Sequence, residues 1–363
     1  MILAAANAVE QRFDRLRFEA KRRLGLLDPF EILPYRGYGT PRELFLKGRV
    51  LEVRGITRSG QHATTWVNLR NMARRFASDE VPGAHLRAYF KGHQVEARAD
   101  EEGFFDVRIE LDEPLTNPAG WHPVELELLN PPSPAGGPVR SKGQVLVPAD
   151  ARFGVISDID DTVVRSSATN ALKLAWIVLL NNAHTRLPFE GVNVFYEALQ
   201  RGAEGRDLNP IFYVSSSPWN IHDVLEDFLD VHGVPAGPLF LKDWSLSVLG
   251  KHRTHKLEII RRLLGTYPDL PFVLIGDSGE EDPEIYLHTV REHPGRVRAI
   301  YIRDVTSAGR DAEVRAIAAE ARSLGTEMVS VADTAAAAEH AASFGLIAPD
   351  AVKEVRLRSS APA

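Results

Sequence analysis

Cysteine is absent from the 363 residues of this chain. Disulfides, a thiolate nucleophile and cysteine-ligated zinc are therefore excluded, which fits a reducing compartment. A long apolar run is missing too: the most apolar stretch, residues 171–180, contains Lys173 and is too short to span a bilayer. The N-terminal residues also lack the basic segment and apolar run of a secretory signal. We therefore expect a cytoplasmic location.

The sequence has no excess of positive charge. It carries 43 Lys and Arg residues against 49 Asp and Glu residues, which gives a net charge of −6. Nucleic-acid-binding domains are usually basic, so we expect no nucleic-acid partner. With 44% hydrophobic residues the chain can build a sizeable core. Its length leaves room for about two domains.

Residues 1–30 are expected to form an N-terminal amphipathic helix. Within residues 6–25, apolar residues from Phe13 to Leu24 recur at helical spacing, and basic residues cover much of the remaining surface. One interpretation is a helix that packs its apolar stripe on the next domain. The other is a peripheral contact with an anionic membrane surface.

Residues 31–150 have the pattern of an antiparallel β-sandwich domain. Apolar and polar residues alternate in residues 86–90, 105–111 and 122–128. A period of two gives each strand one buried and one solvated face, which is typical of a sandwich. This range has no cluster that combines a nucleophile, a base and metal ligands. We expect the domain to bind, position or stabilise rather than to catalyse.

From residue 151 the strands become continuously apolar and alternate with helical patterns. The expected strands cover residues 153–157, 210–214, 271–275, 298–302 and 328–331. Alternation of strands and helices predicts an α/β fold with a doubly wound parallel sheet. Ligands of such sheets bind at the carboxyl ends of the strands. The residues that directly follow these strands are therefore the candidates for a functional site.

Acidic and hydroxyl residues gather after three of these strands, and a lysine opens the helix before the third. They are Asp158, Asp160 and Thr162, then Ser215 and Ser216, then Lys256, then Asp277 and Asp282. Each has a plainer interpretation: a serine can cap a helix, a lysine can be solvated, and acids favour a helix N-terminus. We interpret Glu280 and Glu281 as acids that favour a helix N-terminus, and we expect Asp161 to have a structural role.

Taken in order, these stretches resemble the four motifs of haloacid-dehalogenase-type phosphatases, beginning with DxDxT. The spelling of residues 157–162, 182–186, 213–219 and 275–286 is similar to the actin-patch-protein type of Mg²⁺-dependent phosphatidate phosphatase, and residues 35–39 are similar to its bacterial members. The resemblance implies a haloacid-dehalogenase-like Rossmannoid parallel sheet over residues 151–348. It also implies a small cap insertion at about 163–207, and we expect a tail over 349–363.

The resemblance assigns roles that suit the chemistry of a phosphate ester. Asp158 would be the nucleophile that forms an aspartyl-phosphate, and Asp160 would protonate the leaving alkoxide and then activate water. Mg²⁺ would be held by the Asp158 carboxylate, the Asp160 backbone carbonyl and Asp277, with Asp282 placing a metal-bound water or orienting the lysine. Lys256 would neutralise the phosphoryl group, and Ser215 would donate a hydrogen bond to it.

The expected substrate is phosphatidate, a phospholipid that would be converted to diacylglycerol. Thr162, His184, Arg186 and Ser216 are the candidate substrate contacts. The apolar run 171–180 would meet the acyl chains, or it is simply a buried cap helix. Two alternatives stay open. One is a phosphatase of a soluble ester, such as a sugar phosphate or a nucleic-acid end, and the other is a module that only binds a phosphorylated ligand.

Overall fold

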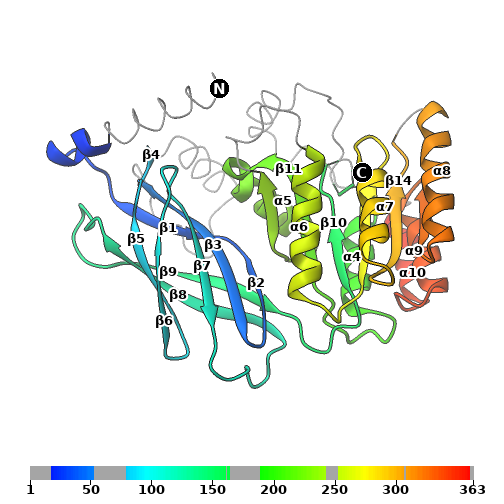
Figure 1. Cartoon of the computed structure of the whole chain (residues 1–363), viewed down its shortest axis with the longest axis horizontal. Coiled ribbons are helices and arrows are strands. Elements are labelled where there is room, and N and C mark those ends of the chain that lie inside the picture. Colours follow the sequence, from blue (N-terminus) through cyan, green and yellow to red (C-terminus); the bar gives the residue numbers. More distant parts are fainter. Residues whose placement is uncertain are drawn as a thin grey trace. The chain divides into compact units, whose positions relative to one another are not determined.

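The computed structural model describes residues 18–52, 79–160, 162–163, 189–242, 252–305 and 308–359 (Figure 1). The chain forms two compact units, Met1–Val147 and Pro148–Ala363. The sequence placed the boundary three residues later, at 150. Most of the expected helix 6–25 lies outside the described residues, although residues 18–23 are helical. Over the described ranges, no helix has the length and the apolarity that a membrane crossing requires.

The first unit is built from nine strands that join in one hydrogen-bonded sheet. They are β1 (Phe30–Pro34), β2 (Gly37–Thr40), β3 (Glu43–Glu52), β4 (Asp79–Glu80), β5 (His85–Phe90), β6 (His93–Arg98), β7 (Phe104–Glu110), β8 (Gly120–Asn130) and β9 (Val139–Val147). The main order is β1-β3-β2-β9-β8-β5-β6, and β4 and β7 also pair with β3. The β2–β9 pair is parallel, whereas β3 pairs antiparallel with each of its neighbours.

Alternation along the strands produces the core of this unit. In β7 the side chains of Val107 and Ile109 are buried, while Asp106 and Arg108 are exposed. Inward residues of β1, β3, β5, β6, β7, β8 and β9 meet in one hydrophobic cluster. A β-sandwich consists of two sheets that pack face to face. The strands of the described residues join in a single hydrogen-bonded sheet, so the sandwich stays a prediction.

The second unit contains a six-stranded parallel sheet with the order β12-β11-β10-β13-β14-β15. Its strands are β10 (Gly154–Ser157), β11 (Ile211–Pro218), β12 (Leu239–Lys242), β13 (Phe272–Asp277), β14 (Val297–Arg303) and β15 (Glu327–Val331). Five of them cover the strands that the apolar runs predict, and β12 was not foreseen. If β10 is numbered as strand 1, the strand order across the sheet is 3-2-1-4-5-6. The order therefore reverses between β10 and β13, and this is the topological switch point of the sheet. The haloacid-dehalogenase-like assignment remains a proposal.

Helices connect these strands (Figure 1). They are α4 (Val192–Arg201), α5 (His222–Val231), α6 (His252–Thr266), α7 (Asp282–Glu292), α8 (Ala308–Ser323), α9 (Thr334–Ser343) and α10 (Ala351–Ser359). Pro218 ends β11, and a short 3₁₀ turn (Trp219–Ile221) precedes α5. The serines before Pro218 therefore belong to a strand and do not cap a helix.

Two further segments differ from the expectation. Helix α4 falls within the range expected for a cap, yet Phe195, Tyr196 and Leu199 are buried in the core. The hydroxyl of Ser157 lies 2.7 Å from the hydroxyl of Tyr196 and donates to the Asp158 carbonyl at 2.6 Å. Because that uses the only hydroxyl proton of Ser157, Tyr196 is the donor of the other bond. The expected tail is helical as α10, which packs against α4 and α9 (Figure 1).

Candidate active site

Three buried carboxylates meet where β10 and β13 end. Ser157 pairs with Ile275 in the parallel register, and the Asp158 amide donates to the Ile275 carbonyl at 2.9 Å. This register brings Asp158 beside the loop that follows β13. Oxygen atoms of Asp158, Asp277 and Asp282 all lie within 4.8 Å of one another. The structure therefore brings together the acids that the sequence selected from separate strands.

Lys256 of α6 reaches into this acidic cluster. Its ammonium donates to Asp282 Oδ1 at 2.7 Å and to Glu280 Oε2 at 2.8 Å, and it lies 2.9 Å from Asp158 Oδ1. Only 3% of its side chain is exposed. Burial by itself would lower the pKa of Lys256, but the carboxylates, with Asp158 foremost, raise it well above its ordinary value. The lysine is thus a fixed positive charge among acids.

Glu280 has a contact that the sequence did not predict. We interpreted it as a residue that favours a helix N-terminus, yet α7 begins at Asp282 and Glu280 pairs with Lys256. Its side chain is 39% exposed, so it forms the solvent-facing part of the cluster. Its position next to the predicted acids was visible in the sequence, but its contact with Lys256 depends on the path of the loop.

The loop 277–282 is folded so that its carboxylates face one another. Asp277 Oδ1 accepts from the amides of Gly279 (2.6 Å) and Glu280 (3.0 Å), and the Asp277 amide donates to Asp282 Oδ2 at 3.3 Å. Gly276 is needed for this fold, because a Cβ there would lie 2.3 Å from Asp282 Oδ2. The close approach of Asp282 thus requires a residue without a side chain.

Arg310 of α8 holds the same loop from outside. Its guanidinium donates to the carbonyls of Ser278 and Glu280, each at 3.2 Å, and to both oxygens of Glu284 at 2.7 and 2.8 Å. Planar two-point pairing of this kind fixes orientation as well as distance. No local pattern in the sequence marks this arginine as different from its neighbours.

Asp160 is held by two hydroxyl groups. Its Oδ2 accepts from Ser215 at 2.8 Å and from Ser217 at 3.2 Å, and its Oδ1 has no hydrogen-bond partner among the described residues. Burial raises the pKa of Asp160, and the Ser215 hydrogen bond opposes part of that shift. Ser215 was expected to donate to a phosphoryl group, whereas here it orients the acid. Ser217 was not foreseen.

The acids near Lys256 form an environment that suits a hard cation. Burial raises the pKa of Asp158, of Asp282 and of Asp277, the last to about 7. Asp158 Oδ2 and Asp277 Oδ2 are buried and lack hydrogen-bond partners within the described part of the chain. Buried carboxylate oxygens without donors are costly unless a cation or a proton compensates them. A site made only of oxygen atoms matches the preference of Mg²⁺.

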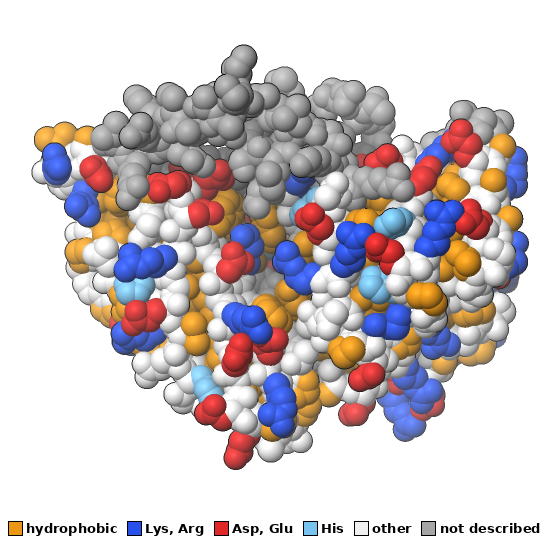
Figure 2. Space-filling model, in the orientation of Figure 1, with side chains coloured by type: hydrophobic (Ala, Val, Ile, Leu, Met, Phe, Trp, Pro, Cys, Tyr) orange, Lys and Arg blue, Asp and Glu red, His pale blue; other side chains and the backbone are white. Residues whose placement is uncertain are grey.

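Two of the remaining predicted contacts, Thr162 and Ser216, lie among the described residues, and the hydroxyl of neither bonds to this cluster. Thr162 is buried and lines an internal cavity of about 20 Å³ together with Tyr196 and Arg303. Ser216 is half-buried, and its hydroxyl has no partner in the described ranges. His184, Arg186, Asp161 and the apolar run 171–180 lie outside the described residues. On the face shown in Figure 2, basic and acidic side chains of the described residues are interspersed.

Comparisons with known proteins relate the second unit to one family. Residues 153–304 match the family model described as "Phosphatidate phosphatase APP1, catalytic domain". The chain is 31% identical over 163 residues to phosphatidate phosphatase APP1 of Saccharomyces cerevisiae, which covers 44% of this chain and 27% of that protein. It is 30% identical over 161 residues to an uncharacterized protein of Schizosaccharomyces pombe, with 43% and 26% covered.

The chain thus spans about a quarter of the length of these two relatives. A carbohydrate acetylesterase from Xanthomonas citri is a structural match that covers 89% of this chain and 71% of its own, at 12% identity and a TM-score of 0.30. A likeness of that size says nothing about fold or function. The matches in sequence support the APP1 family for the segment that carries Asp158, Lys256 and Asp277.

Proposed function

We propose that this chain is a Mg²⁺-dependent phosphatase that hydrolyses phosphatidate to diacylglycerol and phosphate. The observation that carries the proposal is the buried contact of Asp158, Lys256 and Asp282 inside the segment that matches the phosphatidate phosphatase model. Two carboxylates held against one ammonium, with free carboxylate oxygens beside them, suit the transfer of a charged phosphoryl group. The lipid substrate rests on the named relative in yeast.

Asp158 is the proposed nucleophile. Its carboxylate attacks the phosphorus atom, the bond to the alkoxide breaks, and an aspartyl-phosphate forms. Burial raises the pKa of Asp158, and Lys256, 2.9 Å from Asp158 Oδ1, opposes part of that rise and so favours the ionised form that attacks. The bond from Ser157 to the Asp158 carbonyl fixes the backbone from which the nucleophile projects.

Asp160 is the proposed general acid and base. Ser215 and Ser217 occupy its Oδ2 as donors, so the proton belongs on Oδ1, which has no other partner in the described ranges. Because burial raises the pKa of Asp160, this proton is retained closer to neutral pH. Asp160 gives it to the leaving alkoxide, and then takes a proton from the water that attacks the aspartyl-phosphate.

The carboxylates of Asp158 and Asp277 would hold Mg²⁺, with the Asp160 backbone carbonyl as a further ligand, and Asp282 is fixed by Lys256 beside them. Bound Mg²⁺ would offset the negative charge of both the acids and the phosphoryl group. The proposal also includes a cytoplasmic location with peripheral membrane contact through residues 6–25, and a substrate contact from His184 and Arg186. These last features stay predictions.

Phosphate release tests the proposal. The full chain would be assayed with Mg²⁺ on phosphatidate in mixed micelles, on lysophosphatidate and on p-nitrophenyl phosphate. Asp158→Asn and an EDTA sample serve as negative controls, and Asp112→Asn, which removes an exposed carboxylate, serves as the matched control. We expect phosphatidate turnover that both negative controls abolish and that the matched control retains.

Turnover of the soluble ester alone would keep the chemistry and overturn the lipid substrate. Turnover that survives in Asp158→Asn would overturn the nucleophile. The absence of activity on all three substrates would contradict the proposal that the chain is an enzyme, and it would favour a module that binds a phosphorylated ligand.

A further inference from the structure

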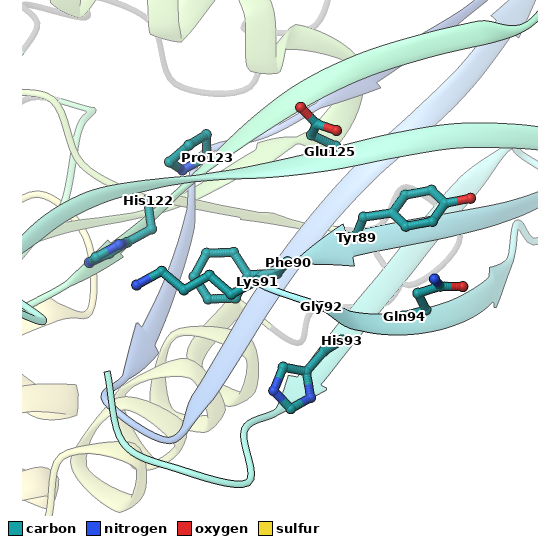
Figure 3. Close-up of a pocket in the computed structure, with 9 residues that line it drawn as sticks. All are labelled: Tyr89, Phe90, Lys91, Gly92, His93, Gln94, His122, Pro123 and Glu125. Carbon is teal, nitrogen blue, oxygen red and sulfur yellow. The ribbon is translucent and has the colours of Figure 1, made fainter. Parts of the chain in front are cut away.

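A pocket lies in the first unit, far along the chain from the acidic cluster (Figure 3). It is formed by the hairpin of β5 and β6 and by the start of β8, and its volume is about 380 Å³. That volume is within the range of small-molecule sites. Its lining includes Phe90, Lys91, His93, Gln94 and His122. Nothing in the sequence analysis assigned a ligand to this domain.

One end of the pocket gathers cationic and imidazole groups. Figure 3 shows Lys91 and His122 reaching toward the same end, with the Phe90 ring alongside the Lys91 chain. No ion pair joins Lys91, His93 or His122 to a carboxylate of the described ranges. The acid on the wall, Glu125, points away from them in Figure 3 and pairs with Lys142 at 3.1 Å. This end of the pocket is therefore complementary to an anion.

The groups at this end are already oriented. His122 Nε2 lies 2.8 Å from the Pro118 carbonyl, and its ring packs edge-on against Phe90 with the ring centroids 6.2 Å apart. Because a carbonyl only accepts, Nε2 carries a proton, and Nδ1 is the atom left for a ligand. Lys91 Nζ lies 5.7 Å from the centre of the Phe90 ring. A ligand would find these side chains in place, which limits the entropy lost on binding.

The backbone of Lys91 supplies a separate observation. Lys91 and Gly92 have φ angles of 45° and 89° and form the two-residue turn between paired Phe90 and His93. Turns with positive φ at both positions favour Asn, Asp or Gly at the first one, where lysine is disfavoured. Residues kept in such a conformation are concentrated at functional sites. The geometry of the turn by itself therefore does not favour a lysine at this position.

We propose that this pocket binds the phosphate group of a small phosphate monoester. The ammonium of Lys91 pairs with the phosphate oxygens, with His122 beside it, and the Gln94 amide meets a hydroxylated or ester body at the other end. A free phosphorylated polyol and the headgroup of phosphatidate share this chemistry. The inference concerns a second site, and it does not depend on the proposed catalysis.

Calorimetric titration of the full chain in EDTA tests the proposal, because EDTA removes the metal from the acidic cluster. The probes are inorganic phosphate, glycerol 3-phosphate, and vesicles of phosphatidylcholine with or without phosphatidate. The decisive variant is Lys91→Asn, which removes the ammonium and suits the positive φ, so it keeps or raises the melting temperature. Lys91→Arg retains the charge, and Arg98→Gln removes an exposed charge of β6 that is not part of the pocket lining.

We expect Lys91→Asn to weaken binding by about tenfold or more, the loss of one charge-assisted contact. Lys91→Arg should bind within a fewfold of wild type, and Arg98→Gln should bind like wild type. Binding of glycerol 3-phosphate without a preference for phosphatidate vesicles would support a free phosphate ester, and the reverse would support a lipid headgroup. Equal binding in wild type and Lys91→Asn, or no binding of any probe at 10 mM, would overturn the site.

Discussion

The guanidinium of Arg310 and the carboxylate of Glu284 form a two-point pair at 2.7 and 2.8 Å, on the outer side of the loop that carries the site acids. The same guanidinium donates to two carbonyls of that loop. We expect Arg310→Ala to lower the affinity for Mg²⁺, because residues 277–282 lose their outer support. The loss of stability should be about 1–3 kcal/mol, as for other hydrogen bonds to charged groups.

The Mg²⁺ dependence of phosphate release and a urea titration measure the two effects of Arg310→Ala. Arg322→Ala on the same helix removes an exposed pair with Glu327 and is the matched control. Its effect on stability should be small, because solvent screens an exposed ion pair. Equal behaviour of the two variants would contradict a positioning role for Arg310.

Lys256→Met should destabilise the protein in a pH-dependent way. Burial raises the pKa of Asp158 and of Asp282, and Lys256 opposes both shifts. Without the lysine these folded-state pKa values rise further above their unfolded values, so the folded state takes up protons and gains stability as the pH falls. Urea unfolding in EDTA at pH 5.5 and pH 8 should show the larger loss at pH 8. The exposed Lys353→Met is the control. A loss that is the same at both pH values would refute the charge argument.

Asp277→Asn should stabilise the metal-free protein above neutral pH while it abolishes the response to metal. Burial raises the pKa of Asp277 from 3.8 to about 7 in the folded state. Ionising it above pH 7 therefore costs stability, by about 1.4 kcal/mol for each unit of pKa shift. Below about pH 4 the carboxyl is protonated in both states, and the advantage of the amide disappears.

Melting temperatures of Asp277→Asn and wild type, in EDTA and in 10 mM Mg²⁺, check this. The variant should melt higher than wild type in EDTA at pH 8, and added Mg²⁺ should raise the melting temperature of wild type alone. Asp112→Asn makes the same chemical change at an exposed position and should do neither. A variant that melts lower than wild type in EDTA at pH 8 would show that the Asp277 hydrogen bonds outweigh its burial.

Ser215→Ala should slow turnover and move the alkaline limb of the pH–rate profile upward. The Ser215 hydrogen bond lowers the pKa of Asp160, so its loss lets that pKa rise, and the proton needed by the leaving group persists to higher pH. The misplaced acid should still reduce kcat, by about 10- to 100-fold, the scale of a general-acid contribution. Ser217→Ala is the graded comparison, because its hydroxyl is at 3.2 Å rather than 2.8 Å. An alkaline limb at the same pH in wild type and in both variants would contradict an effect of the two serines on the pKa of Asp160.

The sequence predicts those strands and candidate site residues that are marked by a short stretch of neighbouring residues. Apolar runs predict β10, β11, β13, β14 and β15, since a buried parallel strand is hydrophobic on both faces. Acids that directly follow such runs are easily recognised in the sequence. Their position alone therefore identifies Asp158, Asp160 and Asp277 as candidate site residues. The four residues of β12 follow a Pro- and Gly-containing stretch and are too few for a periodic pattern.

Contacts between distant segments could not be predicted in this way. Glu280 and Arg310 resemble any charged residue of a helical surface, and only the fold of the loop brings them to Lys256 and Glu284. Ser217 had no distinguishing feature either, because its bond to Asp160 joins positions 57 residues apart. Ser215 stays a predicted site residue, and its partner in the structure is the carboxyl group of Asp160.

The last helix has a practical consequence for anyone who shortens the chain. Ser359 in α10 donates to the Glu190 carbonyl at 3.2 Å, just before α4, and a Cβ on Gly191 would lie 2.6 Å from its hydroxyl. Tyr196 of α4 in turn reaches Ser157 at the base of Asp158. A truncation after residue 348 would therefore remove a support of the proposed nucleophile, although the deleted residues lie outside the matched segment. Purification tags belong after residue 363 and not in place of α10.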